Sequence, residues 1–146
     1  MSQAEQPTKR MSGSCICGAV TLKFAMRNSE VGACHCGMFR KWSGGIFLAV
    51  DGVEDLEITG GDAVVTYRSS DWAERGFCKL CGTSLFWRLH NGDHPVVSAQ
   101  CVDDFEDPKL VSQIFIDEKP DYYSFAEQTR TMTGAEVFAM FAPKAE

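Results

Sequence analysis

Apolar and polar residues alternate along much of the chain, and this pattern predicts a protein built mainly of short β-strands. The clearest example lies between residues 19 and 26, where every second residue is apolar. A two-residue period is typical of a strand with one buried face. The positions predicted to be buried are Val20, Leu22, Phe24 and Met26.

Similar apolar or β-branched runs predict seven further strands, at residues 46–50, 56–59, 63–68, 73–77, 83–89, 96–102 and 111–116. Turn-forming pairs such as Gly60-Gly61 separate them. Helix is scarce. One short helix is expected between Cys36 and Trp42, and a second near Thr133, which forms a capping-box pattern with Glu136. The pattern therefore predicts a mainly β fold of antiparallel sheets with little helix.

The length and composition are those of one globular domain. The chain has 146 residues, of which 45% are hydrophobic and 23% charged. These shares are ordinary for a folded domain, and we expect a disordered N-terminus over residues 1–11 and a single domain over residues 12–142.

The charge and the apolar runs restrict the partners and the location of the protein. A net charge of -6 without a basic cluster argues against binding to nucleic acid or to an anionic membrane surface. The first ten residues are polar, and no apolar run approaches the ~20 residues of a membrane span. We expect a cytoplasmic protein.

Seven cysteines are unusual for a reducing compartment, which does not favour structural disulfides. Cys101 stands alone, whereas the other six form close pairs. Metal thiolates explain such spacing better than disulfides do. The pairs are Cys15 and Cys17, Cys34 and Cys36, and Cys78 and Cys81.

The third pair has the spacing of a zinc knuckle. Cys78 and Cys81 can converge on one ion if the chain turns tightly, and Gly82 suits such a turn. A redox pair is the alternative, but it needs a βαβ context that the pattern lacks. A closed site requires two more ligands. Cys15 and Cys17 can supply them, although cysteines of this kind can also be small core residues. The sequence thus predicts one structural zinc ion on these four cysteines.

Six segments carry a resemblance to a known family. In chain order they read GSCICGAV, CHCGMFRKWSG, ITGG, TYRSS, RGFCKLCGTSLFWR and IFIDEKPDYY. They resemble the glutathione-dependent formaldehyde-activating enzyme family, also called the centromere-protein-V-like family. The resemblance implies an Mss4-like fold of stacked antiparallel sheets, with a structural zinc ion on the first and third cysteine pairs. It also implies a carbon–sulfur lyase, similar to S-(hydroxymethyl)glutathione synthase, that acts on adducts of glutathione or another thiol with an aldehyde.

The chain departs from this family at a second motif. Active members bind a second zinc ion through C-H-C-x-x-C, and Phe39 stands here in the position of the third cysteine. Cys34 and Cys36 are therefore the predicted catalytic residues of a second metal site that lacks one ligand. His35 is expected to point away from them, because neighbouring residues of an extended chain face opposite sides.

More distant residues could complete that second site. The candidates are His90, His94 and Cys101, but a turn-rich surface position explains the two histidines and core packing explains the cysteine. Two functions remain open. The protein is either a lyase whose small-molecule partner is a thiol such as glutathione, or a zinc-stabilised binding or scaffold domain without catalysis.

Overall fold

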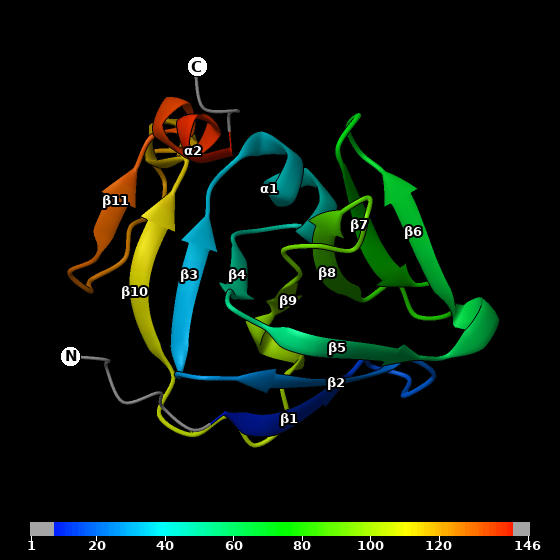
Figure 1. Ribbon diagram of the computed structural model, residues 1–146. Coiled ribbons are helices and arrows are strands. Elements are labelled where there is room, and N and C mark those ends of the chain that lie inside the picture. Colours follow the sequence, from blue (N-terminus) through cyan, green and yellow to red (C-terminus); the bar gives the residue numbers. More distant parts are fainter. Residues whose placement is uncertain (1–7, 142–146) are drawn as a thin grey trace, which may run out of the picture.

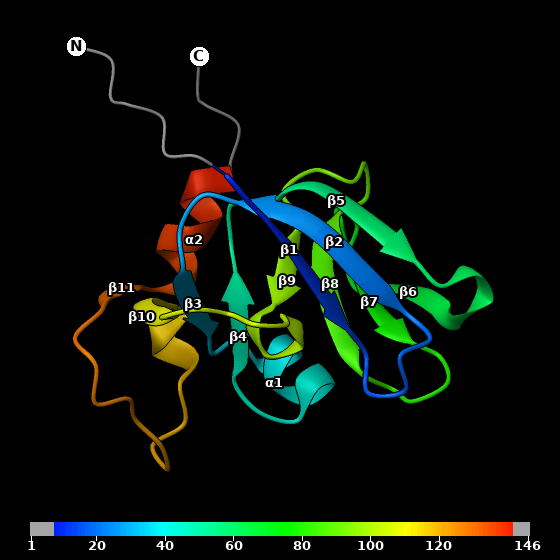
Figure 2. The ribbon, with the colours of Figure 1, turned by 90° about the horizontal axis from the view of Figure 1, so that it is seen from below.

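The computed structural model describes residues 8–141, which form two β-sheets and two α-helices (Figure 1). The smaller sheet is antiparallel, with the strand order β1-β2-β5. Its strands are β1 (Lys9–Ser14), β2 (Thr21–Met26) and β5 (Glu54–Thr59). Figure 2 shows this sheet lying across the strands of the larger one.

The larger sheet has eight strands in the order β11-β10-β3-β4-β9-β8-β7-β6. Most neighbours are antiparallel, but β10 is parallel to both β3 and β11. Its strands are β3 (Glu30–Cys34), β4 (Phe47–Val50), β6 (Val64–Arg68), β7 (Ala73–Cys78), β8 (Ser84–Leu89), β9 (Val96–Ser98), β10 (Lys109–Ile114) and β11 (Arg130–Met132). The predicted mainly β architecture is confirmed, and the expectation of purely antiparallel sheets is corrected at β10.

Two boundaries also differ from the prediction. The run at 96–102 is a strand only as far as Ser98, because residues Ala99–Cys101 form a 3-10 turn. The segment 1–11, predicted to be disordered, overlaps β1, in which Lys9–Met11 pair with Phe24–Met26. Residues 1–7 and 142, at the two ends of the predicted domain scheme, lie outside the described residues.

The main core fills the space between the two sheets. The buried face predicted for residues 19–26 is confirmed. Its four apolar side chains are at most 3% exposed: Val20, Leu22, Phe24 and Met26. They pack in one cluster with residues of the larger sheet, among them Leu85, Phe86 and Val97. Gly76 on β7 lies against the Phe86 ring so closely that a Cβ atom there would be 2.1 Å from the ring. A smaller second cluster contains Cys34, Phe39, Phe47 and Ala49.

The two helices lie near the strand ends at one side of the larger sheet (Figure 1). They are α1 (Gly37–Ser43) and α2 (Gly134–Phe141). The capping box of α2 is confirmed, because Thr133 N–H donates to Glu136 Oε1 at 2.9 Å and Glu136 N–H donates to Thr133 Oγ1 at 3.2 Å. Neither helix in the described part of the chain is long and apolar enough to cross a membrane.

Candidate functional site

The four cysteines predicted to share one zinc ion meet in one cluster. Their sulfur atoms all lie within 4.8 Å of one another, with 3.6 Å between Cys15 and Cys17 and 3.8 Å between Cys17 and Cys78. Four thiolates around a tetrahedral ion at about 2.3 Å have sulfurs about 3.8 Å apart. The fourth member is Cys81. The arrangement therefore fits a metal ion, and among residues 8–141 no other group of three or more potential ligands converges in this way.

Two similar turns build this cluster. Gly18 follows the first pair with φ +80°, and Gly82 follows the third pair with φ +81°, so both glycines have the left-handed backbone that such turns need. The N–H of Gly82 donates to the carbonyl of Cys78 at 2.8 Å. The Ile16 N–H donates to Thr83 Oγ1 at 3.1 Å and ties the β1–β2 turn to the β7–β8 turn.

Thr83 also acts on the cluster directly. Its hydroxyl lies 3.2 Å from Cys81 Sγ. This hydrogen bond, with additional backbone N–H groups of Cys17 and Thr83, lowers the pKa of Cys81 to about 5. A thiolate is the form that binds a metal, so the turn prepares this ligand for coordination.

The second cysteine pair lies at the junction of β3 and α1. Cys34 ends the strand, and Cys36 is the N-cap of the helix, where its sulfur accepts the Phe39 N–H at 3.4 Å. The hydrogen bond with Cys34 is the main reason why the pKa of Cys36 falls to about 6; the Phe39 N–H and the charge of Arg75 add to it, and burial opposes it. The pKa of Cys34 is raised, first by its hydrogen bond with Cys36 and then by burial. At neutral pH the pair therefore holds one thiolate, on Cys36, and one thiol.

Phe39 fills the third position of the motif as a core residue. It is 9% exposed, and its ring stacks on Phe47 with a centroid distance of 4.5 Å. Trp42 packs against both rings, at 6.0 Å and 5.6 Å. The ring belongs to the second core cluster and provides no ligand atom.

Arg75 is a residue of this site that the sequence reasoning missed. It lies on β7, and its guanidinium carbon is 4.1 Å from the centroid of Phe39 and 5.4 Å from that of Trp42. The residue is only 5% exposed, and burial is the main cause that lowers its pKa, whereas the charges of Cys36 and Cys34 oppose this shift. The one signal in the sequence was an arginine in a strand whose alternate positions are apolar.

His35 points away from the cysteines, as predicted. It is fully buried; Tyr123 Oη lies 2.8 Å from Nδ1, and Gln113 Oε1 lies 2.8 Å from Nε2. Since the amide oxygen accepts, Nε2 carries the proton and Nδ1 accepts the tyrosine hydroxyl. Burial lowers the pKa of His35, so the ring stays neutral. Arg40 Nε donates to the His35 carbonyl at 2.8 Å and fixes the backbone between the two cysteines.

None of the distant candidates reaches the second pair. His90 binds Glu74 Oε1 at 3.4 Å and the Ser70 carbonyl at 3.1 Å. The ring of His94 packs edge-on against Phe141. Cys101 belongs to the main core cluster, which confirms its predicted packing role.

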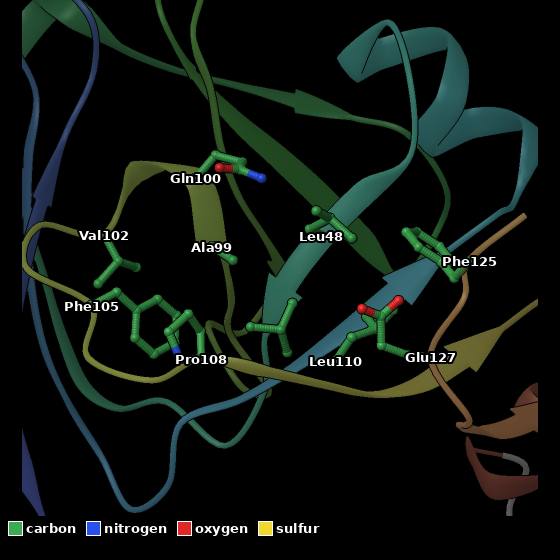
Figure 3. Close-up of a pocket in the computed structure, with 10 residues that line it drawn as sticks. Leu48, Ala99, Gln100, Val102, Phe105, Pro108, Leu110, Phe125 and Glu127 are labelled. Carbon is green, nitrogen blue, oxygen red and sulfur yellow. The ribbon is translucent and has the colours of Figure 1, made fainter. Parts of the chain in front are cut away.

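A groove of about 550 Å³ lies beside β4 (Figure 3). Leu48 lines it, whereas Phe47 and Ala49, its neighbours on β4, belong to the cluster of Cys34. Its lining is mostly apolar, with Glu127 as its one charged residue. The lining of this groove therefore includes none of the cysteines of the three pairs.

Comparisons with known proteins agree with this architecture. The sequence profile of the glutathione-dependent formaldehyde-activating enzyme family matches residues 10–118. A Schizosaccharomyces pombe protein named as an uncharacterized lyase is 36% identical over 126 residues, which cover 86% of this chain and 92% of that protein. The crystal structure of a Rhodobacter sphaeroides protein shares the fold, with a TM-score of 0.53 and 23% identity over 64% of this chain and 89% of the other. The chain therefore belongs to the glutathione-dependent formaldehyde-activating enzyme family.

Proposed function

We propose that the protein is a carbon–sulfur lyase that makes and breaks the bond between a small thiol, such as glutathione, and an aldehyde. Membership of the family and the lyase name of the fission-yeast relative support the class of reaction. The observation that carries the proposal is the pair of Cys34 and Cys36, of which Cys36 is the accessible member and lies at the N-terminus of α1, where its sulfur accepts the Phe39 N–H.

The pair has the properties that such a reaction needs. Cys36 is partly accessible, whereas Cys34 is buried, so a small molecule can approach only one sulfur. A thiolate at Cys36 gives the site a nucleophile, and the Cys34 thiol keeps a proton next to it. Aromatic residues of the second core cluster pack beside the pair and leave Cys36 as its accessible sulfur.

We further propose that the four-cysteine cluster holds one structural zinc ion. Zinc suits four thiolates in a tetrahedron, and the sulfur distances match that geometry. The ion would join the β1–β2 turn to the β7–β8 turn, which otherwise share few bonds. Its binding free energy would then be part of the free energy of folding.

Exchange NMR tests the lyase reaction directly. Formaldehyde and glutathione combine without a catalyst, so the measured quantity is the rate at which ¹³C-formaldehyde exchanges with its glutathione adduct. We expect the protein to raise this rate, Cys36→Ser to abolish the effect and Cys101→Ser to leave it largely intact. An exchange rate equal to the uncatalysed one, with well-folded protein, would reject the proposal.

The second candidate is a zinc-stabilised binding or scaffold domain. Phe39 favours it, because this residue removes the third ligand of the family's second metal site. The two functions differ in the exchange experiment, since a scaffold would bind a thiol or nothing without changing the rate. The ionised thiol next to a buried arginine favours the lyase.

A further inference from the structure

The guanidinium of Arg75 is buried without a carboxylate partner. None of the ion pairs within residues 8–141 includes it, and its Nε and Nη1 atoms have no hydrogen-bond acceptor there. Its Nη2 atom donates to Met38 Sδ, at 3.4 Å. A buried cation is costly unless an anion faces it, and arginine does not give up its proton. The site therefore requires a negative charge beside Arg75.

The nearby groups that can carry this charge are the two cysteine sulfurs. Cys36 and Cys34 are the anionic neighbours that favour the charged form of Arg75, with Cys36 contributing more. One thiolate balances one guanidinium. The site is then neutral without any metal.

The same balance of charges argues against a second zinc ion at Cys34 and Cys36. Two thiolates and a divalent ion sum to zero, so the guanidinium would remain as an unbalanced buried charge. Three thiolates and a divalent ion carry one negative charge, which Arg75 would balance. Phe39 removes that third thiolate, and His35 cannot replace it because both its ring nitrogens bind elsewhere. The residues present therefore do not fit the second ion that the family implies.

We propose that the site of Cys34 and Cys36 works without a metal, and that Arg75 supplies the positive charge that faces the reacting sulfur and aldehyde oxygen. The inference rests on the proposed function only in taking a small aldehyde as the substrate. Cys36 sulfur attacks the aldehyde carbon and forms the C–S bond, while the electron pair of the C=O double bond moves to oxygen. That oxygen takes up a proton from water, which leaves as hydroxide, and a hemithioacetal results without any oxidant or reductant.

Arg75 is suited to this transfer of charge. As the C–S bond forms, the negative charge leaves sulfur and appears on oxygen two bonds away. A guanidinium with unpartnered N–H groups can stabilise the charge at both positions. The reverse reaction uses the same contacts and releases the aldehyde.

Zinc content is the first test. We expect about one zinc ion per wild-type chain, the same content in Cys36→Ser, and almost none in Cys78→Ser. Two ions in the wild type, falling to one in Cys36→Ser, would overturn the proposal.

The second test measures the charge beside Cys36. Iodoacetate is an anion and iodoacetamide is neutral, and both alkylate the same thiolate. The ratio of the iodoacetate rate to the iodoacetamide rate therefore reports the charge near the sulfur and does not depend on the fraction of thiolate. We expect Arg75→Gln to lower this ratio at Cys36 roughly fivefold, the size of effect that one adjacent charge has under aqueous screening. Arg68→Gln, which changes an exposed arginine on β6, should leave it unchanged. Equal ratios in wild type and Arg75→Gln would overturn the proposal.

Two measurements need no Arg75 variant, in case that protein does not fold. In the wild type the iodoacetate preference of Cys36 should exceed that of free glutathione, and an equal or lower preference would contradict the proposal. Addition of ¹³C-formaldehyde should give a hemithioacetal signal on the wild type that Cys36→Ser lacks, and its absence in the wild type would also contradict it. A protein that forms this adduct but does not accelerate glutathione exchange would disprove the proposed lyase function alone.

Discussion

The guanidinium carbon of Arg75 lies 4.1 Å from the centroid of the Phe39 ring, at the position where the family motif has its third cysteine. The ring offers the cation its π-face, and Phe47 stacks against the Phe39 ring with a centroid distance of 4.5 Å. A phenylalanine in this place does two things at once. It removes a metal ligand and it helps to hold a buried positive charge beside the remaining two thiols.

Replacing Phe39 tests this relationship. Phe39→Cys should supply a third thiolate, restore the charge balance with Arg75 and raise the zinc content from about one to about two ions per chain. The lost ring should also lower the free energy of unfolding by about 3 kcal/mol before zinc is added. Elemental analysis and urea unfolding measure the two effects. Phe39→Ser makes nearly the same cavity without a thiolate, so a zinc gain in that variant would contradict the explanation.

The structural site gives a prediction about stability. Cys78→Ser should remove the zinc ion and lower the free energy of unfolding by at least about 3 kcal/mol, because metal binding and folding are coupled. For a domain of this size, that is a fall in melting temperature of roughly 10 °C. Thermal unfolding of purified protein provides the measurement. The control is Cys101→Ser, which changes a buried cysteine outside the four-cysteine cluster and should keep the zinc. Identical melting curves for Cys78→Ser and the wild type would rule out the structural site.

The reactivity of Cys36 should depend on pH in a defined direction. Its pKa is lowered to about 6, so the reactive thiolate is present above that pH and is lost as the pH falls through it. The rate of alkylation by iodoacetamide should therefore reach half its maximum near pH 6. Mass spectrometry of the modified peptide distinguishes this residue from Cys101, whose pKa is raised by burial. A midpoint near 8.5, the value of a free thiol, would show that the pair does not activate Cys36.

Gly76 makes the packing next to Arg75 possible. A Cβ atom at this position would lie 2.1 Å from the Phe86 ring, so Gly76→Ala should lower the free energy of unfolding by about 1–3 kcal/mol or more. Gly45→Ala is the matched control, because a Cβ there meets no atom within 4 Å. Urea unfolding compares the two. Similar midpoints for both variants would mean that Phe86 moves aside at little cost.

Much of the fold follows from local pattern in the sequence. The alternation around Phe24 identified the buried face of β2, because side chains of a strand point alternately to opposite sides. The capping box at Thr133 and Glu136 identified the start of α2 through bonds between residues three apart. β1 and β3 were missed, since polar residues in the one and a glycine in the other hide their periodicity. β1 is held by its pairing with β2, and β3 by its pairing with β4 and with the distant β10, so both strands depend on neighbours in the sheets rather than on their own pattern.

The sequence by itself predicted the four-cysteine cluster, because the ligand spacing and the glycine after each pair already specify two tight turns that present pairs of sulfur atoms. Only the tertiary structure showed that a buried arginine lies beside the second cysteine pair and sets its charge balance. Arg75 lies about forty residues after Cys36 and reaches it because β7 belongs to the same large sheet as β3. Burial and charge balance between such distant residues depend on how the sheet is assembled, and no local spacing encodes them.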